Sequence, residues 1–180
     1  RLGFSIEPDT FAAMKRHAGE LARCAPARIL EEVFKILRCG ASARAFELLR
    51  TIGAMPLLLP GLLQIIESRG ANWEALVSGL SKLDALCEDG VVVSEAVLLG
   101  ALLLPFLDRP APSADSDEDE PRERDLTQPI APILQELVRT ARLPRKIAER
   151  TRLALQAQRH LEQPDGGKKK KRGRNVLGQS

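Results

Sequence analysis

The chain has 180 residues, a length that suits one domain with tails, and a formal net charge of +3. Hydrophobic residues make up 44% and aromatic residues only 3%, with no Tyr, so the core must be built from aliphatic side chains. Such a composition favours helices, because strands are enriched in β-branched and aromatic residues. The longest apolar run, Val97 to Leu107, is too short to cross a bilayer and contains Pro105. We therefore expect no membrane segment.

Helix signals begin near the start of the chain. Pro8 suits the first position of a helix, and a second helix starts near Pro26 and stops at Gly40. Ser42 is the predicted N-cap of a third helix. The apolar stretch that follows must be divided at Pro60, because proline interrupts a helix.

Later elements follow the same pattern. Trp73 to Leu86 has helical periodicity, and Ser94 is placed to cap an apolar helix that ends near Leu107. Two further helices are predicted from about Thr127 and from Pro144. No segment predicts a strand, so the expected fold class is all-α, an irregular helical bundle or array.

Composition also suggests where the chain divides. We expect a helical domain over 1–107, an acidic disordered linker over 108–126, a basic helix pair over 127–163 that packs on that domain, and a disordered basic tail over 164–180. The linker prediction rests on Arg109 to Asp125, which holds three prolines and seven acidic residues and almost nothing apolar.

Positive charge gathers in the last third of the chain. Between Arg139 and Arg174 there are thirteen basic and three acidic residues, a local net charge of +10. This density is typical of a protein that binds a polyanion through its phosphates. A solvated helix surface is an equally good interpretation of Arg139 to Arg159, whereas the KKKKRG run predicts contact with nucleic acid. The candidate RNA-binding residues are Arg142, Arg145, Lys146, Arg150, Arg152, Lys168, Lys169, Lys170, Lys171 and Arg172.

Catalytic and metal-binding patterns are absent from the sequence. There is no P-loop, GxSxG or HExxH motif, and the DxD spacing of Asp117 and Asp119 lies in a charge run with no strand around it. We expect His17 and His160 to be surface residues and not catalytic bases. The cysteines Cys24, Cys39 and Cys87 have no zinc-site spacing, and we expect reduced thiols in a cytoplasmic protein. On its own, the chain is predicted to have no catalytic residue, metal or cofactor.

Two segments near the start carry a family resemblance. RLGFSIEPDTFAAMKR (Arg1 to Arg16) and PARILEEVFKILRCG (Pro26 to Gly40) resemble the neck of class II nucleotidyltransferases, the family of poly(A) polymerases and tRNA CCA-adding enzymes. In that family an Arg and a Glu four residues later brace the neck. The resemblance assigns this role to Arg28 and Glu32, with Lys35 next on the same face, and the spacing allows an ion pair between Arg28 and Glu32.

The resemblance continues along the chain. ARAFELLRTIGAMPLLLPGL (Ala43 to Leu62) is similar to the family's body helices, and Ile133 to Leu161 resembles a late region of poly(A) polymerases. It implies an RNA-binding neck and body, with a catalytic head before Arg1 that would use ATP and Mg²⁺ to add AMP to RNA 3′ ends. Two alternatives stay open: a part of a tRNA CCA-adding enzyme, and a free-standing helical RNA-binding or adaptor protein.

Overall fold

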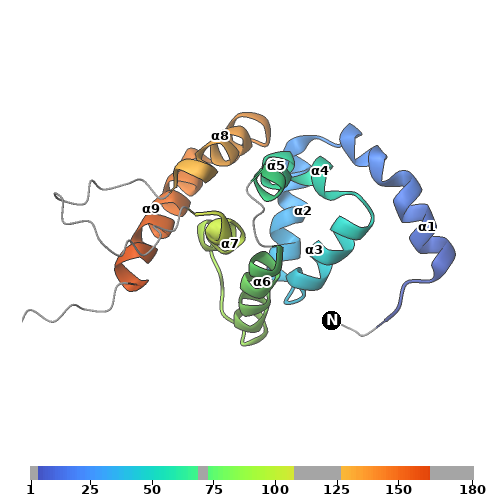
Figure 1. Cartoon of the computed structure of the whole chain (residues 1–180), viewed down its shortest axis with the longest axis horizontal. Helices are drawn as coiled ribbons and strands as arrows, with labels where there is room; N and C mark the ends of the chain where they lie inside the picture. Colours follow the sequence, from blue (N-terminus) through green and yellow to red (C-terminus); the bar gives the residue numbers. More distant parts are fainter. Residues whose placement is uncertain (1–3, 69–72, 108–126, 163–180) are drawn as a thin grey trace, which may run out of the picture.

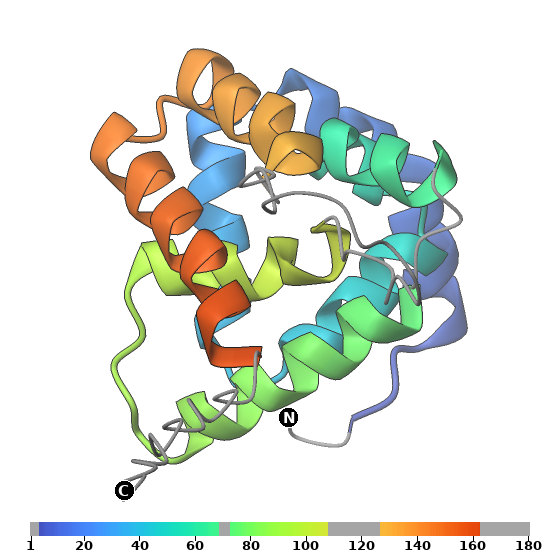
Figure 2. The same ribbon diagram turned by 60° about the vertical axis from the view of Figure 1, so that its left-hand side comes forward.

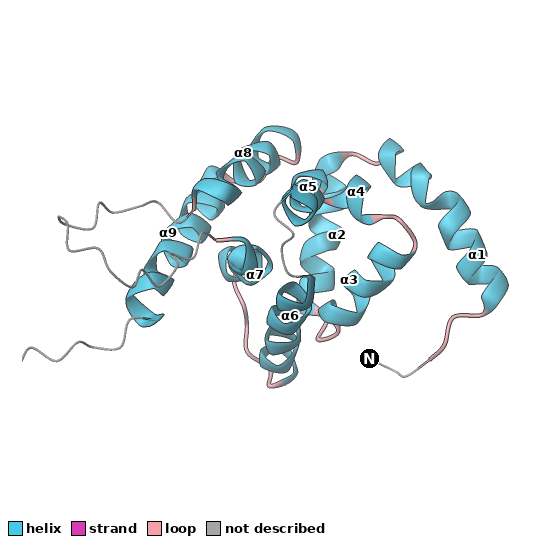
Figure 3. Cartoon of the chain, viewed as in Figure 1, coloured by secondary structure: helices cyan, strands magenta, loops and turns pink. Residues whose placement is uncertain are grey.

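A computed structural model describes residues 4–68, 73–107 and 127–162, and within these ranges every regular element is a helix (Figures 1 and 3). The all-α prediction is confirmed. The predicted acidic linker and basic tail lie outside the described residues. In chain order the elements are α1 (Pro8–His17), η1 (Ala18–Arg23), α2 (Pro26–Arg38), α3 (Ser42–Thr51), α4 (Met55–Leu58), α5 (Pro60–Ser68), α6 (Trp73–Glu88), α7 (Glu95–Leu103), η2 (Leu104–Phe106), η3 (Gln128–Ile130), α8 (Ala131–Thr140) and α9 (Arg145–Glu162).

Prolines and glycines set several boundaries as predicted. Pro8, Pro26 and Pro60 each occupy the first position of a helix, and Pro60 separates α4 from α5. The Glu7 carboxylate accepts hydrogen bonds from the Asp9 and Thr10 amides, which lowers the pKa of Glu7. Gly40 follows α2 with a φ of 70°, a left-handed conformation that side chains other than glycine rarely adopt.

The core lies where α2, α3, α6 and α7 meet. Leu37, Phe46, Leu80 and Leu99 are each at most 1% exposed, and they belong to one continuous apolar cluster. Helix α7 lies between α6 and the α8–α9 pair (Figure 1) and buries six of its nine residues. Helix α1 lies at the edge of the molecule, and neither it nor η1 after it contains a buried residue.

One capping prediction is wrong. Ser42 is the first residue of α3 and its side chain does not cap the helix. Instead, the Asp84 carboxylate of α6 accepts hydrogen bonds from the Ser42 amide at 2.7 Å and the Ala43 amide at 3.0 Å. Ser42 is fully buried, so its short hydroxyl packs inside while a residue 42 positions away satisfies the helix end. Ser94 does occupy the N-cap position of α7, without a side-chain capping bond.

The C-terminal helices are anchored by contacts with the central ones. Thr151 is fully buried, and its hydroxyl lies 3.2 Å from the Ala96 carbonyl of α7 and 2.9 Å from the Ile147 carbonyl of its own helix. On the other side, α8 approaches α5 closely at Gly61, where an added Cβ would lie 3.1 Å from Ile133. These two anchors fix the positions of α8 and α9, which meet in a tight turn (Figure 2).

Two further observations concern the cysteines and the membrane prediction. Cys24, Cys39 and Cys87 form no disulfide within the described residues, and Cys24 and Cys39 are exposed. Burial and the Asp84 carboxylate raise the pKa of the Cys87 thiol. Among the described residues, no helix has the length and apolarity that a membrane span requires.

Candidate nucleic-acid interface

A groove of about 910 Å³ runs between α8 and α9. Four arginines from the two helices and their connecting turn line it, together with one glutamine and one glutamate. The remaining lining residues are apolar. The full lining consists of Ala131, Leu134, Gln135, Val138, Arg139, Arg142, Leu143, Arg145, Ala148, Glu149 and Arg152. Both cationic and apolar surfaces are therefore available to one ligand.

The turn between the helices places Arg142 at this groove. Arg142 has a φ of 57°, and it is the non-glycine residue with positive φ in the described part of the chain. This conformation lets the Leu137 carbonyl accept hydrogen bonds from both the Ala141 and Leu143 amides, each at 3.1 Å. Leu143 is then 2% exposed, whereas Arg142 projects into solvent. The backbone thus accepts an unfavourable conformation at a residue with a long cationic side chain.

The first turn of α9 adds to the positive potential. Arg145 and Lys146 open the helix, and the first turn contains no acidic residue. The amide groups at a helix N-terminus carry partial positive charge and attract anions. This charge adds to that of Arg145 and Lys146 and does not neutralise it. A phosphate at this end of the groove would satisfy both the arginine and the helix dipole.

Glu149 lies within the cationic groove and is paired. Arg152 donates a hydrogen bond from Nη2 to Oε1 of Glu149 at 2.7 Å, and its Nε lies 3.4 Å from Oε2. This hydrogen bond lowers the pKa of Glu149, so the carboxylate is charged at neutral pH. Part of the positive charge of Arg152 is therefore balanced inside the groove.

The predicted RNA-binding residues fall into three groups. Arg142, Arg145 and Arg152 come together in the groove. Lys146 and Arg150 are exposed but do not line it, because they lie on another face of α9. The run from Lys168 to Arg172 lies outside the described residues. The sequence analysis did not assign a site role to Arg139, Glu149 or the apolar residues that line the groove. Arg139 could have been included from its place three residues before Arg142.

The predicted neck residues lie on the exposed face of α2. Arg28, Glu32 and Lys35 are all exposed, and the ion pair on this face joins Glu32 to Lys35 at 2.7 Å. The pair with Arg28 that the spacing allows is not formed, and the bracing role of these three residues stays a prediction. A less exposed ion pair, Arg38 to Glu95 at 3.2 Å, ties the end of α2 to the start of α7.

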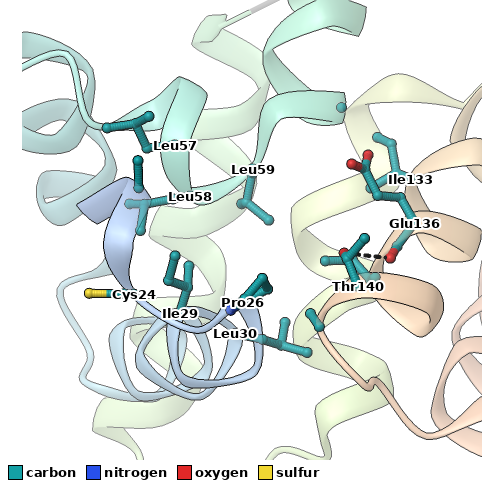
Figure 4. A pocket seen from close by; sticks show the side chains of 14 residues that line it. Cys24, Pro26, Ile29, Leu30, Leu57, Leu58, Leu59, Ile133, Glu136 and Thr140 are labelled. Atoms are coloured by element: carbon teal, nitrogen blue, oxygen red, sulfur yellow. Dashed lines mark hydrogen bonds between the residues drawn. The ribbon is translucent and has the colours of Figure 1, made fainter. Parts of the chain in front are cut away.

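A second, smaller pocket lies on the opposite side of α8 (Figure 4). It has a volume of about 240 Å³ and is lined mainly by apolar side chains of α2, α4 and α8, including Ile29, Leu58 and Ile133. The Glu136 and Thr140 side chains mark its polar edge, and Thr140 donates to the carbonyl oxygen of Glu136. Without any cationic lining residue, this pocket does not suit a phosphate. In the described ranges, no group of three His, Cys, Asp or Glu residues could hold a metal ion.

Comparison with known proteins finds similarity over part of this chain. Residues 3–66 match the family model described as "Probable RNA and SrmB- binding site of polymerase A". The chain is 43% identical over 61 residues to the multifunctional CCA protein of Paracidovorax citrulli, covering 33% of this chain and 15% of that protein. It is 34% identical over 103 residues to the CCA-adding enzyme of Marinobacter nauticus, covering 47% of this chain and 28% of the enzyme.

A third relative agrees with these two. The multifunctional CCA protein of Cupriavidus pinatubonensis is 41% identical over 61 residues, covering 33% of this chain and 15% of that protein. No solved structure matches. Together, the matches show that part of the chain is similar to a polymerase A region described as a probable RNA-binding site and to proteins named as CCA-adding enzymes or CCA proteins. The matched segments span less than a third of the length of these curated relatives.

Proposed function

We propose that this chain is an RNA-binding portion of a polynucleotide adenylyltransferase, which adds AMP from ATP to RNA 3′ ends with the help of Mg²⁺. The observation that carries the RNA-binding part is the convergence of Arg139, Arg142, Arg145 and Arg152 on one groove. Similarity to the polymerase A model and to a CCA-adding enzyme supports the nucleotidyltransferase part. The late helices, Ile133 to Leu161, resemble poly(A) polymerases and support the adenylyltransferase assignment.

Transfer of CCA to tRNA is the second candidate. The three curated relatives described above are named as CCA proteins or a CCA-adding enzyme, and this favours a tRNA substrate. The family model is named after polymerase A and favours the first candidate. The RNA-binding groove serves either activity, because it addresses phosphates and apolar surface that both classes of RNA provide.

RNA binding is tested by fluorescence anisotropy of the full chain with a labelled RNA at several salt concentrations. Arg145→Gln should weaken RNA binding and reduce its salt dependence by about 0.7 in the logarithmic slope, as expected for one lost phosphate contact on a single strand. Lys82→Gln is the matched control, since Lys82 is exposed on α6 outside the groove. It should leave the affinity unchanged.

A third variant separates the groove from the family-matched segment. Arg44→Gln removes an exposed charge within residues 3–66. A loss of affinity at Arg44 that exceeds the loss at Arg145 would overturn the assignment of the groove. Salt-independent binding, or no binding, would overturn the RNA-binding proposal itself.

The reaction is tested on the whole protein of which this chain forms a part. With Mg²⁺ and an unstructured A-rich RNA, incorporation of labelled AMP from ATP supports adenylyl transfer to RNA ends. Incorporation of CMP into a tRNA that lacks its CCA end supports the second candidate. Failure of both reactions in a correctly folded protein would contradict the proposed enzyme class.

A further inference from the structure

The groove between α8 and α9 combines two surfaces that phosphate binding alone does not require. Its cationic members surround a floor made of Ala131, Leu134, Val138, Leu143 and Ala148. Leu134 and Leu143 are buried in the core behind it, so the floor is held rigidly. The groove therefore presents an apolar surface between charged groups.

The partly exposed members of this floor, Ala131, Val138 and Ala148, determine which ligand fits best. Water in contact with these apolar side chains is released when another apolar surface covers them. In an A-form duplex the bases are stacked and paired, and their faces cannot reach a recessed floor. A single strand can turn a base out of its stack, so its phosphates and a base face are available together.

The positions of the arginines also suit a single strand with one base turned out of its stack. Arg142 and Arg145 lie at the turn between α8 and α9, at one end of the floor, whereas Arg152 lies two helical turns further along α9. A guanidinium group is planar and can both hydrogen bond to phosphate and stack on a base. The carboxylate of Glu149 accepts hydrogen bonds from Arg152 and so holds this guanidinium group in the groove.

We infer that this groove is a subsite for single-stranded RNA, in which an unstacked base lies on the apolar floor while the arginines hold the flanking phosphates. This inference rests on the proposed RNA-binding function and narrows it to one class of RNA and one mode of contact. The small pocket on the other side of α8 takes no part, because arginine and lysine are absent from its lining.

The test compares three labelled RNAs of equal length and charge per strand with the full chain. These are an unstructured single strand, the same strand with abasic sites at its central positions, and a blunt duplex. The intact single strand should bind about fivefold to tenfold more tightly than the abasic strand, since stacking of one or two bases has an effect of this size. The duplex should bind no better than the abasic strand.

A gain-of-function variant makes the test independent of folding defects. Gln135 is exposed and lines the groove, so Gln135→Tyr adds a stacking platform beside the floor without disturbing the core. It should tighten single-strand binding about fivefold and leave abasic RNA unaffected. Gln128→Tyr is the matched control, because Gln128 is exposed on η3 and does not line the groove.

The outcomes distinguish a failure of the base subsite from a failure of the proposed RNA-binding function. If Arg145→Gln weakens all three RNAs equally and the abasic strand binds as tightly as the intact one, RNA binding stands and the base subsite is wrong. If no RNA shows salt-dependent binding, the proposed function fails first. Tighter binding of an acidic peptide such as a ten-residue polyglutamate than of the single strand would also overturn the inference, since it would assign the groove to a protein.

Discussion

Arg142 combines a backbone conformation that favours glycine with a side chain that no glycine could supply. A left-handed conformation is unfavourable by roughly 1–2 kcal/mol for a residue with a Cβ atom. Since glycine would fit the turn with less strain, the arginine is suited to binding rather than to folding. Residues in such conformations are concentrated at functional sites.

This division of roles predicts opposite effects of two glycine substitutions. Arg142→Gly should leave the free energy of unfolding unchanged or raise it by up to about 1 kcal/mol, because the strain is relieved. Arg139→Gly, three residues earlier within α8, should lower it by about 1 kcal/mol, because glycine destabilises a helix. Both variants lose one groove charge. In urea unfolding the two variants should therefore change stability in opposite directions. In RNA titration they should lose similar amounts of affinity.

Glu149 is the acidic member of the groove, and its removal should strengthen RNA binding. Glu149→Gln abolishes its charge and releases Arg152 from the ion pair at 2.7 Å, so affinity for RNA should rise about twofold to fivefold at low salt, the size of effect that surface ion pairs have. Glu47→Gln on α3 is a matched control with an exposed glutamate. A decrease in affinity for Glu149→Gln would show that the carboxylate contacts RNA directly.

The same residue defines a dependence on pH. The hydrogen bond from Arg152 lowers the pKa of Glu149, so its stabilising pair is fully present above the ordinary pKa of glutamate and is lost as the pH falls through the lowered value. RNA affinity in the wild-type chain should therefore rise only in strongly acidic solution. Between pH 6 and 8 the Glu149→Gln variant and the wild type should keep a constant ratio of affinities.

At the scale of elements, α3 depends on a residue of α6 for its N-terminus. Asp84→Ala should lower the free energy of unfolding by about 1–2 kcal/mol, because the buried Ser42 amide and its neighbour lose their acceptor. Asp89→Ala, an exposed position just after α6, should change it by less than about 0.5 kcal/mol. Equal effects of the two substitutions in urea unfolding would contradict the capping role.

Helix α8 is positioned by the absence of a side chain at Gly61. Gly61→Leu should destabilise the fold by about 1–3 kcal/mol, because even a Cβ atom would lie 3.1 Å from Ile133 and 3.4 Å from Glu136. Gly79→Ala should instead stabilise it by up to about 1 kcal/mol, since the nearest atom is at an ordinary 3.7 Å and alanine favours a helix. Thermal unfolding separates the two, and RNA affinity should fall only for Gly61→Leu.

Local signals predicted most of the elements. Proline at a first helical position and glycine after a last turn act through the backbone itself, so Pro26 and Gly40 bounded α2 correctly. The prediction that Ser42 caps α3 is wrong because the acceptor of a helix N-terminus is the one that lies nearest in space. Here this acceptor is Asp84, which only the packing of α6 on α3 brings there. Local sequence holds no information about that contact.

The whole molecule explains why only part of the candidate site was predictable. Charge density along the chain identified Arg142, Arg145 and Arg152 without their geometry. The groove floor was not predictable in the same way, because Leu134 and Leu143 have the periodicity of core residues and are indeed core residues. They line the groove as well only because the turn at Arg142 sets α9 beside α8. A binding surface that core residues help to form can therefore be recognised only once the tertiary arrangement is known.

The chain has two cationic regions, the groove between α8 and α9 and the run from Lys168 to Arg172. The salt dependence of RNA binding can show how much each of them contributes. Four arginines in the groove should give a logarithmic salt slope of about −3 with a single strand, from about −0.7 for each phosphate contact. Lys168 to Arg172 add five positive charges in the sequence and should make the slope steeper. Replacing these five residues with glutamine in the full chain should return the slope to about −3 while the single-strand preference is kept. Complete loss of RNA binding in that variant would mean that the basic run carries the affinity and that the groove does not.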